Sequence, residues 1–248
     1  MCPDMEITDV KSSQPRPPGA ARWGARICAG VAALPVWALL MPVMAQGACE
    51  IPGAGTELPA LIRRGQCVEL KSEFLLGRDL SVEGRLLVQP EARLELAPGV
   101  AVEIAPKADL QVRGTLGLNA GSMLRLKEFG SLRVDGELYA RQEAALQMGR
   151  SSSFDAPGSV HFFPGAFLRL EKDAKLKTNG RFSLDGARLE AGAAQWENGG
   201  TLQLLPGSVV ALSGSTTLRN RGTIRTESDT LISVSDTGDR KSTRLNSS

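Results

Sequence analysis

Short stretches of alternating apolar and polar residues, cut by glycine, Pro-Gly or Asn-Gly, fill the chain between residues 72 and 238. The segment VRGTLGLNAG, residues 112–121, is typical, because Leu116 and Leu118 alternate with small residues between Gly114 and Gly121. Such alternation predicts short β-strands with one buried face. Glycine allows the sharp bends that turns between them require, often with positive φ.

The glycines recur at a fixed interval of 22 residues, with one step shortened to 20. One series consists of Gly114, Gly136, Gly158, Gly180, Gly200 and Gly222. A second series in the same register consists of Gly99, Gly121, Gly165 and Gly207.

The apolar residues keep this register in five columns. Two columns are Leu94, Leu116, Leu138, Val160, Phe182, Leu202 and Ile224, and Leu96, Leu118, Ala140, Phe162, Leu184 and Leu204. Two more are Val102, Leu124, Leu146, Leu168 and Val210, and Ile104, Leu126, Met148, Leu170 and Leu212. The fifth is Val88, Leu110, Leu132, Phe154, Leu176, Trp196 and Leu218.

Three strands and three turns in each period predict an all-β fold, a parallel β-solenoid of seven to eight coils over residues 72–238. A meander of antiparallel hairpins would also explain the alternation, but not the common register of all five columns. No window shows sustained helical periodicity. The general chirality of parallel crossovers favours a right-handed coil.

On this repeat length and column pattern, the sequence resembles the right-handed parallel β-helix proteins, which include pectate-lyase-like enzymes and autotransporter passenger domains. The resemblance covers about two thirds of the chain and is specific for fold rather than function. Enzymes of this class usually carry their sites on loops inserted at the turns, and the near-constant coil length leaves no room for a long loop.

The two ends of the chain differ from the repeats. Residues 1–45 read as a signal peptide with an extended N-terminal region, because arginines precede a short apolar run and Val43 and Ala45 fit a cleavage site. An uncleaved membrane anchor is the alternative. Residues 239–248 resemble translated adaptor or vector sequence, so we expect a non-native tail and the N-terminal fragment of a longer exoprotein.

Export makes a disulfide the default expectation for Cys49 and Cys67, the cysteines that remain after signal cleavage. It would close residues 46–71 as a cap on the solenoid. We expect no cofactor or metal, since the chain has one histidine, His161, and no CxxC motif.

Charge is nearly balanced in the mature chain. Residues 1–45 and 239–248 hold seven of the 29 Lys and Arg and four of the 27 Asp and Glu, which leaves 22 basic and 23 acidic side chains. This balance does not predict a polyanion-binding surface, so no nucleic-acid partner is expected. Nor is a transmembrane span expected once the signal is removed.

Equivalent outward positions vary in residue type. One outward column reads Gly117, Tyr139, His161, Ser183, Gln203 and Arg225, and another reads Asn119, Arg141, Phe163, Asp185, Leu205 and Glu227. Tyr139, Arg141, His161 and Phe163 form a candidate surface binding patch, because aromatic faces flanked by arginine suit sugar or protein partners. The alternative is scattered exposed apolar side chains without a role.

No catalytic constellation emerges from the acidic residues. They fall singly in different columns, at Asp109, Asp135, Asp155, Asp173 and Asp185. A carboxylate pair for glycoside hydrolysis could not be assembled from them, so we expect no enzyme in this chain.

The sequence therefore predicts a secreted structural or adhesive β-solenoid at a bacterial cell surface, with glycans or cell-surface proteins as partners. The N-terminal part of a β-helical polysaccharide lyase or glycosidase is one alternative. A membrane-anchored periplasmic scaffold is another.

Overall fold

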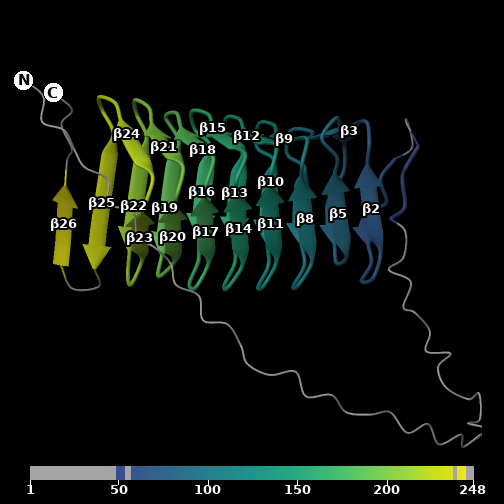
Figure 1. Ribbon diagram of the computed structural model, residues 1–248, viewed down its shortest axis with the longest axis horizontal. Coiled ribbons are helices and arrows are strands. Elements are labelled where there is room, and N and C mark those ends of the chain that lie inside the picture. Colours follow the sequence, from purple (N-terminus) through teal and green to yellow (C-terminus); the bar gives the residue numbers. More distant parts are fainter. Residues whose placement is uncertain (1–48, 54–56, 237–238, 244–248) are drawn as a thin grey trace, which may run out of the picture. The chain divides into compact units, whose positions relative to one another are not determined.

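The chain forms a right-handed parallel β-solenoid of about eight coils with three strands in each coil (Figure 1). The computed structural model describes residues 49–53, 57–236 and 239–243, and no helix occurs among them. The predicted fold class is confirmed. The predicted signal peptide, residues 1–45, lies outside the described residues.

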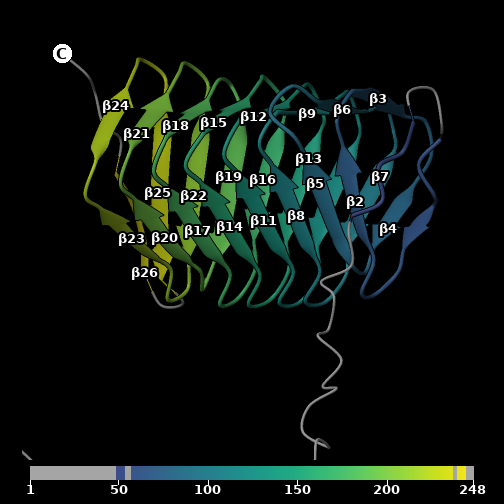
Figure 2. The ribbon, with the colours of Figure 1, turned by 45° about the vertical axis from the view of Figure 1, so that its right-hand side comes forward.

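Equivalent strands of successive coils stack into three sheets (Figure 2). Sheet A contains β2 (Cys67–Leu70), β5 (Arg85–Val88), β8 (Asp109–Val112), β11 (Ser131–Val134), β14 (Ser153–Ala156), β17 (Lys175–Thr178), β20 (Gln195–Asn198) and β23 (Thr217–Asn220). Sheet B contains β1 (Leu61–Ile62), β4 (Leu80–Val82), β7 (Ala101–Ile104), β10 (Met123–Leu126), β13 (Ala145–Met148), β16 (Phe167–Leu170), β19 (Arg188–Gly192), β22 (Val209–Ser213), β25 (Leu231–Asp236) and β26 (Asp239–Thr243). Sheet C contains β3 (Glu73–Leu76), β6 (Arg93–Leu96), β9 (Thr115–Leu118), β12 (Glu137–Ala140), β15 (Ser159–Phe162), β18 (Arg181–Leu184), β21 (Thr201–Leu204) and β24 (Thr223–Thr226).

The core is built from the predicted columns, with one correction. Four of the five columns pair as predicted, and Leu189 and Ala191 fill the positions left open in the two sheet B columns. The column predicted for Val88 is wrong, because β5 pairs Leu86 with Leu110 and Val88 with Val112. The turn from β7 to β8 is two residues longer than the turn from β4 to β5, so a fixed step of 22 fails there.

The three corners of each coil bend by different means. At the corner from sheet A to sheet C, a β-carbon on Gly158 would lie 2.1 Å from the carbonyl oxygen of Gly136 in the preceding coil. Glycine is needed there for close backbone approach, and the predicted positive φ is wrong for this series. Between sheets C and B the expectation holds, since Gly99, Gly121, Gly165 and Gly207 have φ between 69° and 81°.

In five coils, a left-handed residue other than glycine forms the corner from sheet B to sheet A. These residues are Lys107, Phe129, Ser151, Asp173 and Ala193, with φ between 53° and 66°. Side chains in this region cost about 1–2 kcal/mol relative to glycine. Gly65 and Gly214 take the left-handed position at this corner in only two coils, so no regular glycine series marks it in the sequence.

A row of hydrogen-bonded polar side chains, which we call the polar ladder, crosses the largely apolar core beside Trp196. The Trp196 indole donates to Thr178 Oγ1 at 3.3 Å, and Thr178 donates to Asn198 Oδ1 at 3.0 Å. The Asn198 amide donates to Asn220 Oδ1 in the next coil at 2.7 Å. Buried Thr178 and Asn198 are thus satisfied by neighbouring coils.

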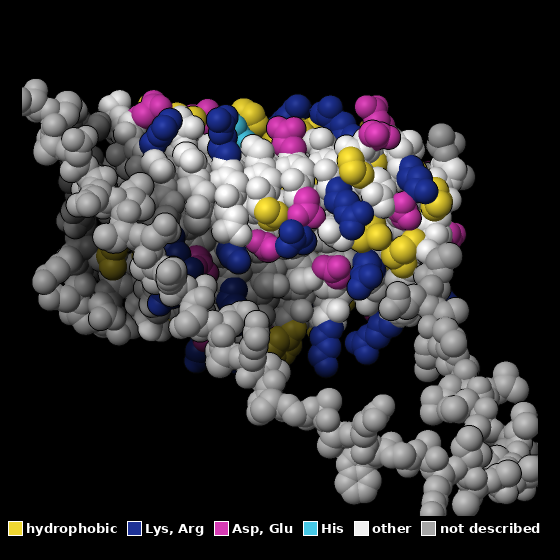
Figure 3. Space-filling view, in the orientation of Figure 1, with side chains coloured by type: hydrophobic (Ala, Val, Ile, Leu, Met, Phe, Trp, Pro, Cys, Tyr) yellow, Lys and Arg dark blue, Asp and Glu magenta, His cyan; other side chains and the backbone are white. Residues whose placement is uncertain are grey.

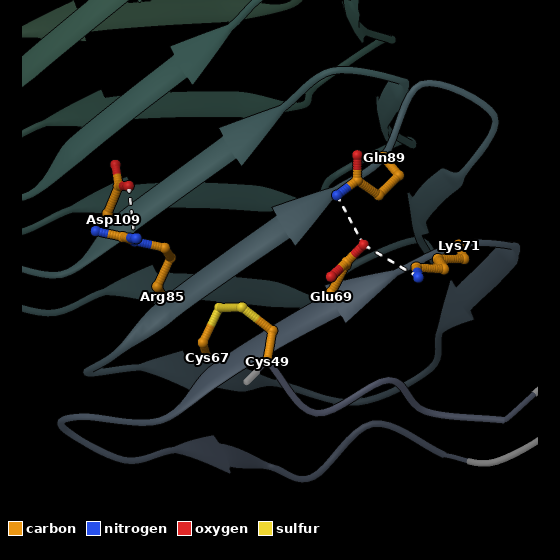
Figure 4. The surroundings of a disulfide bond; sticks show 7 residues. All are labelled: Cys49, Cys67, Glu69, Lys71, Arg85, Gln89 and Asp109. Atoms are coloured by element: carbon orange, nitrogen blue, oxygen red, sulfur yellow. Dashed lines mark hydrogen bonds and ion pairs between the residues drawn. A yellow bond between two sulfur atoms is a disulfide. The ribbon is translucent and has the colours of Figure 1, made fainter. Parts of the chain in front are cut away.

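The predicted Cys49–Cys67 disulfide is present (Figure 4). It joins β2 to the segment before it, and the Glu50 backbone pairs with β2 as a further rung of sheet A. Strands β1 and β2 already belong to the stacked sheets, so two of the three strands of the first coil lie within the segment predicted as a cap, residues 46–71.

At the other end, β26 pairs antiparallel with β25. This strand falls in residues 239–248, the predicted non-native tail, and it is the one antiparallel neighbour among the described strands. The non-native origin of these residues stays a prediction.

Candidate functional site

Sheet C carries the predicted patch, Tyr139, Arg141, His161 and Phe163, on its outer face and at its edge. Hydrophobic, basic and acidic side chains alternate along this side of the molecule, at the top of Figure 3. We call these four residues the sheet C patch.

Tyr139 lies flat over the preceding coil. It points outward from β12, and its ring covers Gly117 of β9, where a β-carbon would lie 2.4 Å from the phenol oxygen. The side chain is only 8% exposed. Glycine at position 117 has no side chain, and the Tyr139 ring fills the space that this leaves. Tyr139 is therefore largely buried and does not offer an exposed aromatic face to a ligand.

The phenol group reaches a charged pair on β6, two coils away. Tyr139 donates a short hydrogen bond to Glu95, and Arg93 donates to the Tyr139 oxygen at 2.7 Å. Arg93 also pairs with Glu95, and the Asn119 amide donates to Glu95 at 2.9 Å. Three neighbouring coils are cross-linked on their outer face by this cluster.

Hydrogen bonding sets the protonation states in the cluster. Burial raises the pKa of Glu95, but hydrogen bonds from Tyr139, Asn119 and Arg93 outweigh it and hold the pKa below its ordinary value. Burial and the bond to Glu95 raise the pKa of Tyr139. The phenol therefore stays protonated and keeps its donor role at neutral pH.

The other three residues of the patch are more accessible: Arg141 and Phe163 are exposed, and His161 is partly exposed. The Arg141 guanidinium lies 5.1 Å from the centre of the Tyr139 ring. The rings of His161 and Phe163 stack with centres 4.1 Å apart and planes 13° apart. Phe163 is 37% exposed and, with Arg141, Gln142, Pro164 and Gly165, lines a shallow hollow.

His161 is held neutral at physiological pH. Desolvation lowers its pKa, and the charges of Asp185 and Glu137 only partly oppose that effect. No group in the described part of the chain forms a hydrogen bond with its buried Nε2 atom. The neutral ring acts as a stacking support for Phe163.

Two carboxylates that sequence reasoning left apart are brought together on sheet A. Arg133 contacts Asp135 at 2.7 Å and Asp155 at 2.6 Å. Burial raises the pKa of Asp135, but Arg133 and Gln111 outweigh it and lower the pKa overall. The column pattern could not show this pair, because Asp135 lies in a turn and Asp155 in the next strand of the sheet.

Within residues 49–53, 57–236 and 239–243, no three His, Cys, Asp or Glu side chains are grouped as metal ligands. The same residues include no helix long and apolar enough to cross a membrane.

Comparisons with protein-family models, with curated protein sequences and with solved structures found no match to this chain. Its function is therefore inferred from the geometry of the solenoid and its surface.

Proposed function

We propose that this protein is an exported structural or adhesive β-solenoid at a bacterial cell surface, which contacts glycans or surface proteins through the sheet C patch. The partly exposed Phe163 ring, stacked on His161 beside Arg141, is the observation that carries the proposal. An aromatic face next to a guanidinium offers both stacking and hydrogen bonding to a ligand.

The strands that carry the sheet C patch are held in place by neighbouring coils, which favours ligand recognition over catalysis. Its strands are paired on both sides, and Tyr139 ties β12 to β6 through Arg93 and Glu95. A preorganised surface loses little conformational entropy when it binds. The glutamate of the cluster is ionised and fully engaged, so it serves to position the tyrosine.

Export is part of the proposal. The Cys49–Cys67 disulfide supports it, because such bonds persist in oxidising compartments. Secretion or display at the surface is the favoured location, and the periplasm is the alternative.

A polysaccharide lyase or glycosidase is the second candidate function. The grouping of Asp135 and Asp155 about Arg133 is the observation that favours it. Both carboxylates are bound to the arginine, which suits a structural ion-pair network better than acid–base chemistry.

Adhesion of the purified full chain tests the proposal. Binding to bacterial and host cells, extracellular matrix and a glycan array would be measured for wild type, Phe163→Ala and Phe129→Ala. Phe129 is also an exposed phenylalanine, but it lies at a different corner. Phe163→Ala should weaken binding about tenfold, the value of one aromatic contact, whereas Phe129→Ala should bind as wild type does.

The second candidate function is tested on the same protein by assays for new reducing ends, which a glycosidase produces, and for unsaturated uronates, which a lyase produces. Cleavage of a uronic-acid polymer without binding to any cell, matrix or glycan would overturn the adhesive function. If Phe163→Ala and Phe129→Ala bound equally well, the sheet C patch would not be the binding surface of the adhesive protein.

A further inference from the structure

The column of outward residues that holds Tyr139 and His161 extends across sheet C to an exposed leucine. Leu75 pairs with Glu95, Glu95 with Gly117, Gly117 with Tyr139 and Tyr139 with His161. Four steps at the usual spacing of parallel strands make about 19 Å. The line runs along the solenoid axis, perpendicular to the strands.

An exposed apolar side chain lies beside a hollow at each end: Leu75 begins the line, and Phe163 lies two residues after His161, where the line ends. Leu75 is 72% exposed, the most exposed of the large hydrophobic residues in the described part of the chain. It lines a hollow with Glu73, Phe74, Arg93 and Glu95. At the far end Phe163 borders the hollow it shares with Arg141.

Between the ends the surface is polar. Arg93, Glu95 and Asn119 lie there with the covered ring of Tyr139. Protein–protein interfaces show the reverse order, with an apolar core and a polar rim. Apolar contacts at two separate ends with hydrogen-bonding groups between them suit a chain rich in hydroxyl groups.

The charges along the line argue against an anionic chain. Arg93 and Arg141 are basic, and so is Arg78 beside Leu75. Arg78 and Arg93 are already paired with Glu57 and Glu95, and Glu73 and Glu137 add two further carboxylates. A polyanion would gain little long-range attraction from such a surface.

We infer that the ligand of the sheet C patch is an uncharged linear oligosaccharide, which lies along the solenoid axis from Leu75 to Phe163. This inference rests on the proposed function and specifies its ligand class and orientation. A sugar ring stacks on Phe163, while hydroxyl groups of the middle residues bond to Arg93, Asn119 and Arg141. The far end of the oligosaccharide covers Leu75.

Chain length is the variable that tests this geometry. Calorimetric titration of the full chain would use chito-, cello-, xylo- and malto-oligosaccharides from dimer to hexamer, with hyaluronan oligomers as the anionic series. At least one uncharged series should gain about tenfold in affinity from dimer to hexamer, because only the longer chains reach both ends.

Two variants separate the ends of the line. Leu75→Ser should weaken hexamer binding and leave dimer binding unchanged, whereas Phe163→Ala should weaken both. Leu75 is 72% exposed, so thermal unfolding of Leu75→Ser should match wild type, and Phe129→Ala is the matched control for Phe163→Ala.

The outcomes distinguish the inference from the proposed function. Affinity independent of length, no effect of Leu75→Ser, tighter binding of hyaluronan, or a protein as the cell-surface ligand would each overturn the inference. Adhesion that still depends on Phe163 would leave the proposed function standing.

Discussion

Replacement of Gly158 by alanine should destabilise the solenoid far more than the same change at Gly121. A β-carbon on Gly158 would lie 2.1 Å from the Gly136 oxygen and 2.5 Å from the Asp135 oxygen, both of them backbone atoms of the preceding coil. Two coils must separate by about 1 Å before such contacts become tolerable. At Gly121 the nearest atom to an added β-carbon lies 3.9 Å away, and only the positive φ of 69° is unfavourable.

The magnitude follows from the bonds at this corner. Gly158 donates to Val134 at 2.9 Å, and Ser159 donates to Gly136 at 2.8 Å. Loss of both costs about 2 kcal/mol, and overpacking adds about 1–3 kcal/mol. We therefore expect Gly158→Ala to lower the free energy of unfolding by about 3–5 kcal/mol, against about 1 kcal/mol for Gly121→Ala.

Urea unfolding followed by far-UV circular dichroism measures the difference. Both variants should unfold with the slope of wild type, so that the shift in midpoint reports stability. If Gly121→Ala lost as much stability as Gly158→Ala, close approach of the coils would not be the reason for glycine at the A-to-C corner.

Three further changes test other parts of the structure. Replacement of Cys49 and Cys67 by serine should cost about 3 kcal/mol in urea unfolding, since the bridge closes a separation of 18 residues; an unchanged midpoint would contradict this. Glu95→Gln should be less stable than wild type at neutral pH but lose less on acidification. The pKa of Glu95 is lowered in the folded state, so the ionised side chain stabilises the fold above its ordinary pKa, and this stabilisation is lost as pH falls through the folded-state pKa. If the stabilities of wild type and Glu95→Gln changed in parallel with pH, this prediction would be wrong. Phe129→Gly should raise stability by up to about 1 kcal/mol, because the 53% exposed phenylalanine has a left-handed backbone with φ of 59°; a lower thermal midpoint would refute the assignment of strain.

The repeat made most of the fold predictable, because register, strand number and core columns are all encoded in the spacing of leucine and glycine. Val88 shows where this ends. A fixed step of 22 cannot show that one turn has gained two residues while another has lost two. The 22-residue spacing predicts a corner at Gly158. Glycine is required there because the backbone of the preceding coil lies close to it, which only the folded structure shows.

The candidate site was predicted in position but not in character. Spacing alone placed Tyr139, Arg141, His161 and Phe163 on adjacent coils. It could not show that the Tyr139 ring would lie over Gly117 and bond to Glu95 two coils away, because that contact depends on the space that Gly117 leaves in the coil between them. Spacing did not indicate Leu75 either, since its exposure became meaningful only once the column from β3 to β15 was established.

The polar ladder of Thr178, Asn198 and Asn220 makes the coils unequal as building blocks. Where the strand positions that face the core are all apolar, from Leu94 to Val160, a copied or deleted coil would present a similar surface to its neighbours. Removal of the coil that contains Thr178 would instead place the buried amide of Asn198 against Ala156, which offers no side-chain hydrogen bond. Evolution or an engineer could thus lengthen this protein freely through its first coils, while the later coils must be inherited as a set.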